Sequence, residues 1–147
     1  MFGKLFAVAL LAGLADSIDL TYKDCGSTAR VTKVFSDDCA SSVCKAKKGH
    51  SYKIQISYAP NKPVTAMQAT LHGVIAGIPV PFPLPESDGC KLSGDSCPIS
   101  AGTEVTFAEG LDVKSSYPAI KLVSRWELID QDRGEVICVE IPVVIVN

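Results

Sequence analysis

The sequence HGVIAGIPVPFPLP, residues 72–85, begins like an apolar β-strand and ends with prolines at alternating positions. Proline fixes φ and donates no hydrogen bond to a neighbouring strand, so the second half cannot lie inside a central strand. It predicts an extended edge or rim of a sheet. The residues between the prolines are nevertheless apolar: Ile78, Val80, Phe82 and Leu84. The stretch therefore fits either a rim that meets an apolar ligand or a core edge closed by a turn.

Strand-like alternation of apolar and polar residues extends on both sides of this stretch. The clearest example is 51–58, where every second residue is apolar or aromatic, as in a strand with one buried and one hydrated face. Similar patterns predict strands over 29–35, 64–75, 103–107, 120–128 and 136–146. Turn residues separate these segments, and no amphipathic helix is evident. Such a series of strands predicts a β-sandwich or a barrel.

The first residues have the pattern of a secretory signal. Lys4 precedes a short apolar run over 5–14, and small residues follow where a signal peptidase cleaves. We predict cleavage after Ala15, or after Ser17 as the alternative, which leaves residues 16–147 as one domain of a secreted or luminal protein. The apolar run is too short to span a bilayer. A buried amino-terminal helix is the competing interpretation, but the run lacks a cap and a polar helical face.

The charge balance argues against nucleic acid as a partner. Removing Lys4 leaves 13 basic residues against 16 acidic ones, a formal charge near −3, and no basic stripe is visible. The pI of about 5.6 means that the protein gains net positive charge in an acidic lumen. We therefore expect transient contact with anionic membranes at acidic pH.

Six cysteines follow the predicted signal: Cys25, Cys39, Cys44, Cys90, Cys97 and Cys138. An even number in a secreted chain predicts disulfides, although the sequence alone permits many connectivities. Spacing suggests two local rings, Cys39–Cys44 and Cys90–Cys97, which leaves Cys25 to pair with Cys138. A zinc site is the alternative, but it requires closely paired ligands, and no Cys-x-x-Cys is present.

Catalytic chemistry is not indicated by the titratable residues. His50 lies in a predicted turn and is expected to be solvated, whereas His72 lies in a predicted strand and is expected to be hydrogen-bonded in a structural role. The chain has no Gly-x-Ser-x-Gly motif, and acid pairs such as Asp37-Asp38 lie in turns. We expect the protein not to be an enzyme and to need no cofactor or metal ion.

Several short motifs occur in a fixed order along the chain. They are DCGS at 24–27, HG at 72–73, GIPVPFP at 77–83, DGC at 88–90, CPI at 97–99, YP at 117–118, KL at 121–122, WEL at 126–128 and CVEIP at 138–142. Together they resemble the ML (MD-2-related lipid-recognition) family, and within it the soluble luminal Niemann-Pick type C members. The resemblance covers essentially the whole mature chain, and the ending ICVEIP at 137–142 is more similar to arthropod members.

The resemblance implies an all-β, immunoglobulin-like sandwich of two antiparallel sheets with an apolar cavity between them. It also implies the disulfides Cys25–Cys138, Cys39–Cys44 and Cys90–Cys97. Such a cavity is expected to be a dry, preformed slot, because polar lining residues would weaken the binding of an apolar ligand.

In the family the ligand enters with its apolar tail first and keeps its hydroxyl near the mouth. The positions of this sequence that match the lipid-binding pocket are Phe82, Val113, Tyr117, Pro118 and Trp126. The resemblance places Phe82 and Tyr117 at the mouth, Val113 and Pro118 beside them, and Trp126 in the interior.

The function implied is that of a monomeric, secreted or lysosomal protein that binds cholesterol or a related sterol. It would exchange the sterol with membranes or with a membrane-bound acceptor. The loop Ala76-Gly77-Ile78 matches the segment that docks onto the membrane-bound Niemann-Pick type C protein, with Ala76 in place of a bulkier apolar residue. An extracellular carrier or sensor of fatty acids, semiochemicals or microbial lipids is the alternative. A structural immunoglobulin-like module with a filled core is a third possibility.

Overall fold

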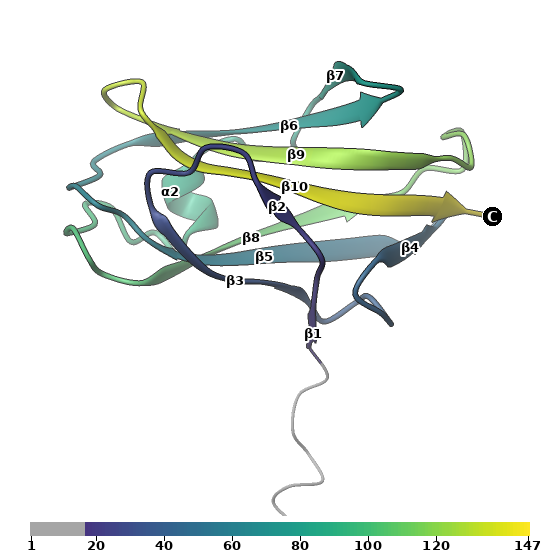
Figure 1. Ribbon diagram of the computed structural model, residues 1–147, viewed down its shortest axis with the longest axis horizontal. Coiled ribbons are helices and arrows are strands. Elements are labelled where there is room, and N and C mark those ends of the chain that lie inside the picture. The colour runs from purple at the N-terminus through teal and green to yellow at the C-terminus, as the bar shows by residue number, and fades with distance from the viewer. Residues whose placement is uncertain (1–16) are drawn as a thin grey trace, which may run out of the picture.

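The computed structural model describes residues 17–147, whose regular structure is almost entirely β-strand (Figure 1). The strands are β1 (Ile18–Asp19), β2 (Lys23–Asp24), β3 (Arg30–Ser36), β4 (Cys44–Lys47), β5 (Ser51–Ala59), β6 (Met67–Ile75), β7 (Ile78–Phe82), β8 (Val105–Asp112), β9 (Lys121–Asp130) and β10 (Glu135–Val146), and the short helix is α2 (Gly89–Leu92). The predicted signal peptide, residues 1–15, lies outside the described residues. Within them, no helix has the length and apolar character needed to cross a membrane.

Two sheets lie face to face, as predicted for a sandwich. One is four-stranded with the order β1-β3-β5-β8, and the other is six-stranded with the order β2-β10-β9-β6-β7 and with β4 added beside β10. The pairs are antiparallel, as expected, except for the short parallel pairing of β4 with β10 at one edge. Figure 1 shows the two layers, with α2 at one end between them.

Inward-facing side chains of both sheets form one core. On β10 the residues Ile137, Val139 and Ile141 have no exposed surface, and on β9 Trp126 and Leu128 are buried opposite them. This matches the period-two patterns of the predicted strands 120–128 and 136–146, because every second side chain of a strand points to the same face. Burying each of these large apolar side chains stabilises the fold by roughly 1.5–3 kcal/mol.

The strand boundaries differ from the predicted ones where local contacts replace the regular pairing between neighbouring strands. The predicted strand 64–75 begins only at Met67, because Val64 forms an isolated bridge with Ile99. The helix α2 is unpredicted: it is a single turn, too short for a helical period, and Asp88 caps it by accepting hydrogen bonds from the amides of Cys90 and Lys91. The strand predicted over 103–107 begins at Val105 and continues to Asp112, so it reaches the far end of the sandwich.

The proline-rich half of residues 72–85 forms the edge strand β7, as predicted. It pairs only with β6, and the residues Ile75 to Ile78 close the hairpin with a two-residue turn. Both central residues of that turn have positive φ, 52° at Ala76 and 80° at Gly77, which is the conformation of a type I′ turn. Prolines are tolerated on this strand because an edge strand needs hydrogen-bond donors on one side only.

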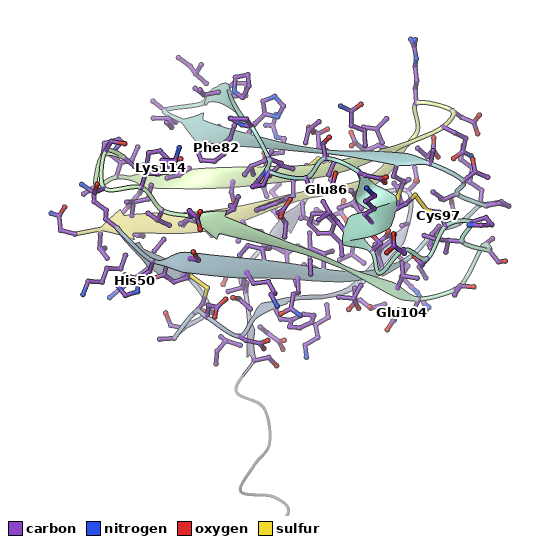
Figure 2. The ribbon with its side chains drawn as sticks, turned by 180° about the vertical axis from the view of Figure 1, so that it is seen from behind. His50, Phe82, Glu86, Cys97, Glu104 and Lys114 are labelled. Carbon is purple, nitrogen blue, oxygen red and sulfur yellow. A yellow bond between two sulfur atoms is a disulfide. The ribbon has the colours of Figure 1, made fainter. Side chains whose placement is uncertain are left out.

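The disulfides join Cys25 to Cys138, Cys39 to Cys44 and Cys90 to Cys97. This is the pairing that spacing suggested and that the family resemblance implies. The first connects residues 113 positions apart and holds the amino-terminal segment against β10, whereas the other two close short loops. Figure 2 shows the two ends of the sandwich, with His50 and Lys114 at one end and Cys97 and Glu104 at the other.

Candidate functional site

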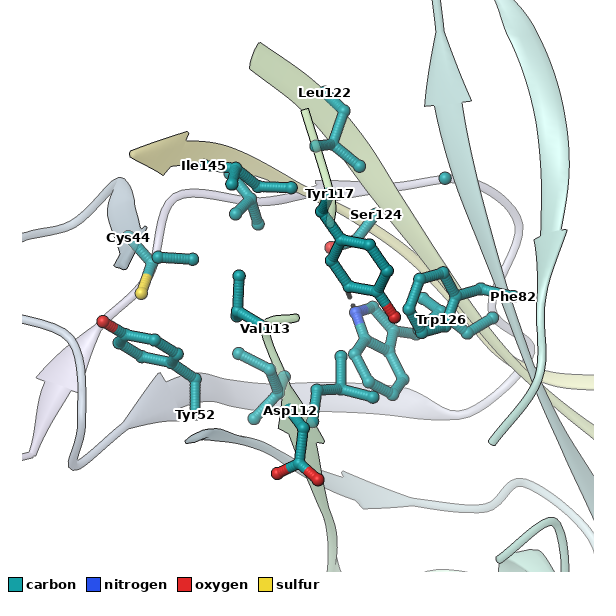
Figure 3. Close-up of a pocket in the computed structure, with 16 residues that line it drawn as sticks. Cys44, Tyr52, Phe82, Asp112, Val113, Tyr117, Leu122, Ser124, Trp126 and Ile145 are labelled. Atoms are coloured by element: carbon teal, nitrogen blue, oxygen red, sulfur yellow. Dashed lines mark hydrogen bonds between the residues drawn. The ribbon is translucent and has the colours of Figure 1, made fainter. Parts of the chain in front are cut away.

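An apolar cavity lies between the two sheets at the end where β5 begins, β8 ends and β9 begins (Figure 3). Its wall is formed mainly by inward-facing side chains of six strands, β5 to β10, and of the loop after β8: Tyr52, Ile54, Leu71, Phe82, Leu111, Val113, Tyr117, Leu122, Trp126, Val143 and Ile145. Its volume is about 100 Å³. That is less than the roughly 300–1,000 Å³ of a typical ligand pocket, so the cavity must widen to hold a sterol. An apolar slot is present between the sheets, but it is narrower than the ligand that the family resemblance implies.

Four of the five predicted pocket residues border this cavity: Phe82, Val113, Tyr117 and Trp126. The rings of Phe82 and Tyr117 meet edge to face, with their centroids 5.6 Å apart and an interplanar angle of 75°. Both rings are half-buried, as expected of side chains at a mouth. Edge-to-face packing of this kind stabilises the pair by about 0.5–1.5 kcal/mol, so it can hold the mouth closed and still open for a ligand.

Pro118 does not border the cavity. It is exposed in the loop between β8 and β9, directly after Tyr117. The half-buried Tyr117 closes the wall at this point, and the chain leaves the interior after it. Pro118 therefore lies next to the mouth residue Tyr117, as predicted, but it is not part of the cavity lining.

The polar groups deep in the cavity wall bond to one another. Trp126, which is 2% exposed, donates a hydrogen bond from Nε1 to Oγ of Ser124 at 3.1 Å. The Ser124 hydroxyl in turn donates to the carbonyl oxygen of Ile141 at 2.9 Å. Because these groups are satisfied within the protein, they do not require water, and the cavity surface that remains is apolar.

Asp112 is the acidic residue at the cavity wall, and its carboxylate points away from the interior (Figure 3). The neighbours Leu111 and Val113 face the cavity, so alternation along the strand directs Asp112 outward. Its Oδ1 accepts a hydrogen bond from the hydroxyl of Ser51 at the start of β5. The carboxylate is therefore a structural contact between β5 and β8 and is not positioned for acid–base chemistry on a bound ligand.

The sequence prediction missed further lining residues on β6, β9 and β10. Leu122, Val143 and Ile145 lie on the apolar faces of the predicted strands 120–128 and 136–146, but alternation does not distinguish a cavity wall from a filled core. Gly73 on β6 also borders the cavity, and a Cβ atom there would lie 3.3 Å from Cδ1 of Leu122. A side chain at this position would crowd Leu122 or occupy part of the cavity.

The predicted docking loop is an exposed apolar corner of the molecule. Ile78 is 65% exposed, and Ile75 and Val80 on either side of the turn are also exposed. Large apolar side chains that lie together in water often mark an interaction surface. The turn lies outside the cavity lining and is thus a separate candidate surface.

The two histidines lie outside the cavity lining. His50 is exposed in the loop between β4 and β5, as predicted. The prediction that His72 is hydrogen-bonded is wrong: its Nδ1 lies 3.9 Å from Oε1 of Glu127 and has no hydrogen-bond partner among residues 17–147. His72 projects from the outer face of β6, where this half-exposed carboxylate is its charged neighbour.

Several proteins to which this chain is similar are named as cholesterol transporters. The family model of the ML domain matches residues 19–145. NPC intracellular cholesterol transporter 2 of Canis lupus familiaris is 39% identical over 139 residues, which cover 94% of this chain and 93% of that protein. The protein of the same name from Danio rerio is 40% identical over 147 residues, which cover 98% of each. The crystal structure of a Niemann-Pick type C2 protein from the Japanese carpenter ant superposes with a TM-score of 0.79 at 26% identity, covering 86% of this chain and 100% of that one.

Proposed function

This chain belongs to the ML domain family, and from that premise we propose that it binds one sterol between its sheets and transfers it to a membrane or a membrane-bound acceptor. The observation that carries the proposal is the apolar cavity, which is closed at its mouth by the contact between Phe82 and Tyr117. Its deep polar groups are paired with each other. The cavity therefore suits an apolar ligand that undergoes exchange and no covalent chemistry.

Burial of the ligand supplies the free energy of binding. Each CH₂ group removed from water contributes roughly 0.8 kcal/mol, so a sterol gains more than about 10 kcal/mol before the costs of association are subtracted. Part of this gain is spent on widening a cavity of about 100 Å³. Tyr117 lies in a loop and Phe82 on an edge strand, so both can move without breaking a central ladder.

The proposed orientation places the sterol tail inside and its hydroxyl at the mouth. Trp126 and Leu71 offer apolar surface in the interior, where an unpaired hydroxyl would cost roughly 1–3 kcal/mol. Phe82, Val113 and Tyr117 would contact the rings of the sterol near the opening. The water outside the mouth would hydrate the hydroxyl.

A titration with a fluorescent sterol tests the assignment of the mouth. We expect Phe82→Ala and Tyr117→Ala each to weaken binding about tenfold or more, because an aromatic contact surface is worth roughly 1.5–3 kcal/mol. Ile78→Ala, on the exposed β6–β7 turn, is the control and should bind as the unmodified protein does. Unchanged affinity in both mouth variants would refute the site assignment.

We propose that the protein works in the secretory route, either in extracellular fluid or in the lumen of the lysosome. An acidic compartment is favoured by the ionisation of Glu135 at the start of β10. Burial, together with the adjacent carboxylate of Glu127, raises the pKa of Glu135 to about 7, and Arg125 lowers it only in part. Burial also raises the pKa of Glu109, which lies on the inward row of β8.

These raised pKa values predict greater stability in mild acid than at neutral pH. Below a pH of about 4.5, the pKa of Glu135 in the unfolded chain, this carboxyl group is protonated in both the folded and the unfolded state. Between that pH and about 7 the group stays protonated in the folded state but loses its proton in the unfolded state. The free energy of unfolding should therefore decrease as the pH rises through this window. Urea unfolding at a series of pH values measures it. Glu135→Gln should flatten the decrease, whereas Asp37→Asn, on an exposed turn, should leave it unchanged; a flat profile of the unmodified protein would contradict the prediction.

We further propose that Ala76, Gly77 and Ile78 form the surface that meets the membrane-bound Niemann-Pick type C protein. The support is the exposure of Ile78 at the tip of a rigid two-residue turn. Because Phe82 lies on the strand that follows the turn, a partner at this loop would be near the mouth of the cavity.

A further inference from the structure

We propose that Glu109, an acidic side chain buried between the sheets, binds a hydroxyl group on the tail of the sterol. The inference rests on the proposed sterol function and adds the class of sterol. A cavity with such a group accepts sterols that are hydroxylated on the side chain, which a wholly apolar interior would reject. Glu109 would thus determine the ligand specificity of the protein.

Glu109 lies on the inward-facing row of the edge strand β8. Side chains two positions apart on a strand point to the same face, and this row runs from Leu111 through Glu109 to Phe107. Leu111 borders the cavity, and Phe107 is buried in the core. Ile54, which pairs with Glu109 on β5, also borders the cavity. Glu109 is therefore the next inward side chain behind the lining.

This position is at the depth that the proposed orientation gives to the sterol tail. Along the chain, Leu111 and Val113 separate Glu109 from the mouth. On the other side of Glu109, the ring of Phe107 lies 5.9 Å from that of Trp126, the interior residue of the opposite sheet. A sterol that enters through the mouth is longer than a cavity of about 100 Å³, so its tail would extend along the strands past Leu111.

The carboxyl group of Glu109 has hydrogen-bonding capacity that the protein leaves unused. The residue is only 7% exposed. Its Oε1 accepts a hydrogen bond from the amide of Gly110 at 3.1 Å, whereas its Oε2 is buried and has no hydrogen-bond partner among residues 17–147. Buried polar atoms without a partner are uncommon in folded proteins. A hydroxyl group of the ligand would supply the missing partner.

The protonation of Glu109 favours a neutral ligand group over an acidic one. Burial raises the pKa of Glu109, the amide of Gly110 opposes this shift, and the carboxylate of Glu86 adds to it. Glu86 is half-exposed and lies 3.8 Å from Nζ of Lys91. A hydroxyl group can donate to a carboxylate and can also accept from a protonated carboxyl group, so it fits both forms of Glu109. The carboxylate of a fatty acid would be repelled by the charged form.

An inward charge on an edge strand also has a purely structural explanation. β8 is the last strand of the four-stranded sheet, and inward-pointing charged residues discourage association between exposed edges. On that explanation, removal of the charge promotes self-association and leaves the choice of ligand unchanged. Ligand specificity and oligomeric state therefore distinguish the two roles.

Equilibrium binding of two radiolabelled sterols to the mature protein in solution tests the inference. One is cholesterol, and the other, 25-hydroxycholesterol, carries an additional hydroxyl near the end of its tail. We expect the unmodified protein to bind the tail-hydroxylated sterol at least as tightly as cholesterol, because Glu109 pairs with the hydroxyl. An interior without such a partner would bind it about tenfold or more weakly, since a buried hydroxyl that has no partner loses its hydration.

Two variants of Glu109 and one control assign the effect to its carboxyl group. Glu109→Leu should weaken binding of the tail-hydroxylated sterol by about tenfold or more and change cholesterol binding by less than about threefold. Glu109→Gln retains a hydrogen-bonding group of the same size and should keep binding of both sterols within about threefold. Glu104→Leu makes the same chemical change at an exposed site before β8 and should bind both sterols as the unmodified protein does. Circular dichroism checks that each variant is folded.

The possible failures of the inference and of the proposed function differ. The inference is wrong if the unmodified protein binds the tail-hydroxylated sterol about tenfold more weakly than cholesterol, a comparison that needs no variant. It is also wrong if Glu109→Leu keeps the ratio of the two affinities, and self-association of that variant in size-exclusion chromatography would then assign Glu109 to protection of the edge. Both results leave cholesterol binding in place. If no form of the protein binds either sterol, the proposed function fails and the inference fails with it.

Discussion

Replacement of Val113 by Trp should abolish saturable sterol binding while the sandwich remains folded. Val113 follows the end of β8, and its side chain projects into the cavity between Tyr52 and Tyr117 (Figure 3). A sterol must already widen this cavity of about 100 Å³, and an indole at position 113 would fill the space that the ligand has to enter. Overpacking of this kind costs about 1–3 kcal/mol of stability, which a typical domain of this size tolerates.

Val80→Trp is the control that separates filling of the cavity from the general effect of adding a tryptophan. Val80 is exposed on β7, close to the mouth but outside the lining, and it receives the same increase in volume. Fluorescent-sterol titration and circular dichroism are measured on both variants. Val80→Trp should bind with unchanged affinity, and Val113→Trp should show no saturation. Normal binding by a folded Val113→Trp protein would place the ligand somewhere other than this cavity.

Removal of the Cys25–Cys138 disulfide should lower the free energy of unfolding by about 4–5 kcal/mol. The bond joins residues 113 positions apart, and the loop it closes in the unfolded chain includes most of the domain. In the chain-entropy model a loop of this length gives nearly the largest stabilisation that a disulfide provides. Because the total stability of a domain is about 5–15 kcal/mol, the variant with both cysteines replaced by alanine should lie close to unfolding at room temperature.

Denaturant unfolding of a second variant shows whether the length of the closed loop determines how strongly a disulfide stabilises the protein. Cys90 and Cys97 are only 7 positions apart, so their replacement by alanine should cost about 2–3 kcal/mol by the same model. Both losses should be measured in the absence of ligand, because bound sterol would add to the stability of the folded state. Equal losses for the two pairs would show that local strain or packing, and not the length of the closed loop, determines the stabilisation.

Much of the fold could be predicted from local patterns because the long strands alternate cleanly. The runs on β5, β9 and β10 each present an apolar face, and their cysteines and prolines mark loops and an edge. The short elements could not be predicted. β1, β2 and β4 have two to four residues, too few to show a period, and they exist because longer strands offer them unpaired edges.

The site was predictable only in part, and for a physical reason. Phe82, Val113, Tyr117 and Trp126 matched motif positions of the family and lie at the cavity. Leu122 and Ile145 lie in the same alternating apolar pattern as residues of the filled core. The distance between the sheets determines whether such a residue lines the cavity or fills the core.

The most direct test of sterol binding is the identity and amount of lipid that the protein carries when it is purified from its own source. Organic extraction followed by mass spectrometry, with the lipid quantified per mole of protein, measures both. The cavity and the family predict sterol as the principal lipid, approaching one molecule per chain, and markedly less in Val113→Trp prepared in the same way. Fatty acids or another lipid class in place of sterol, or no lipid together with no uptake of added sterol, would contradict the account.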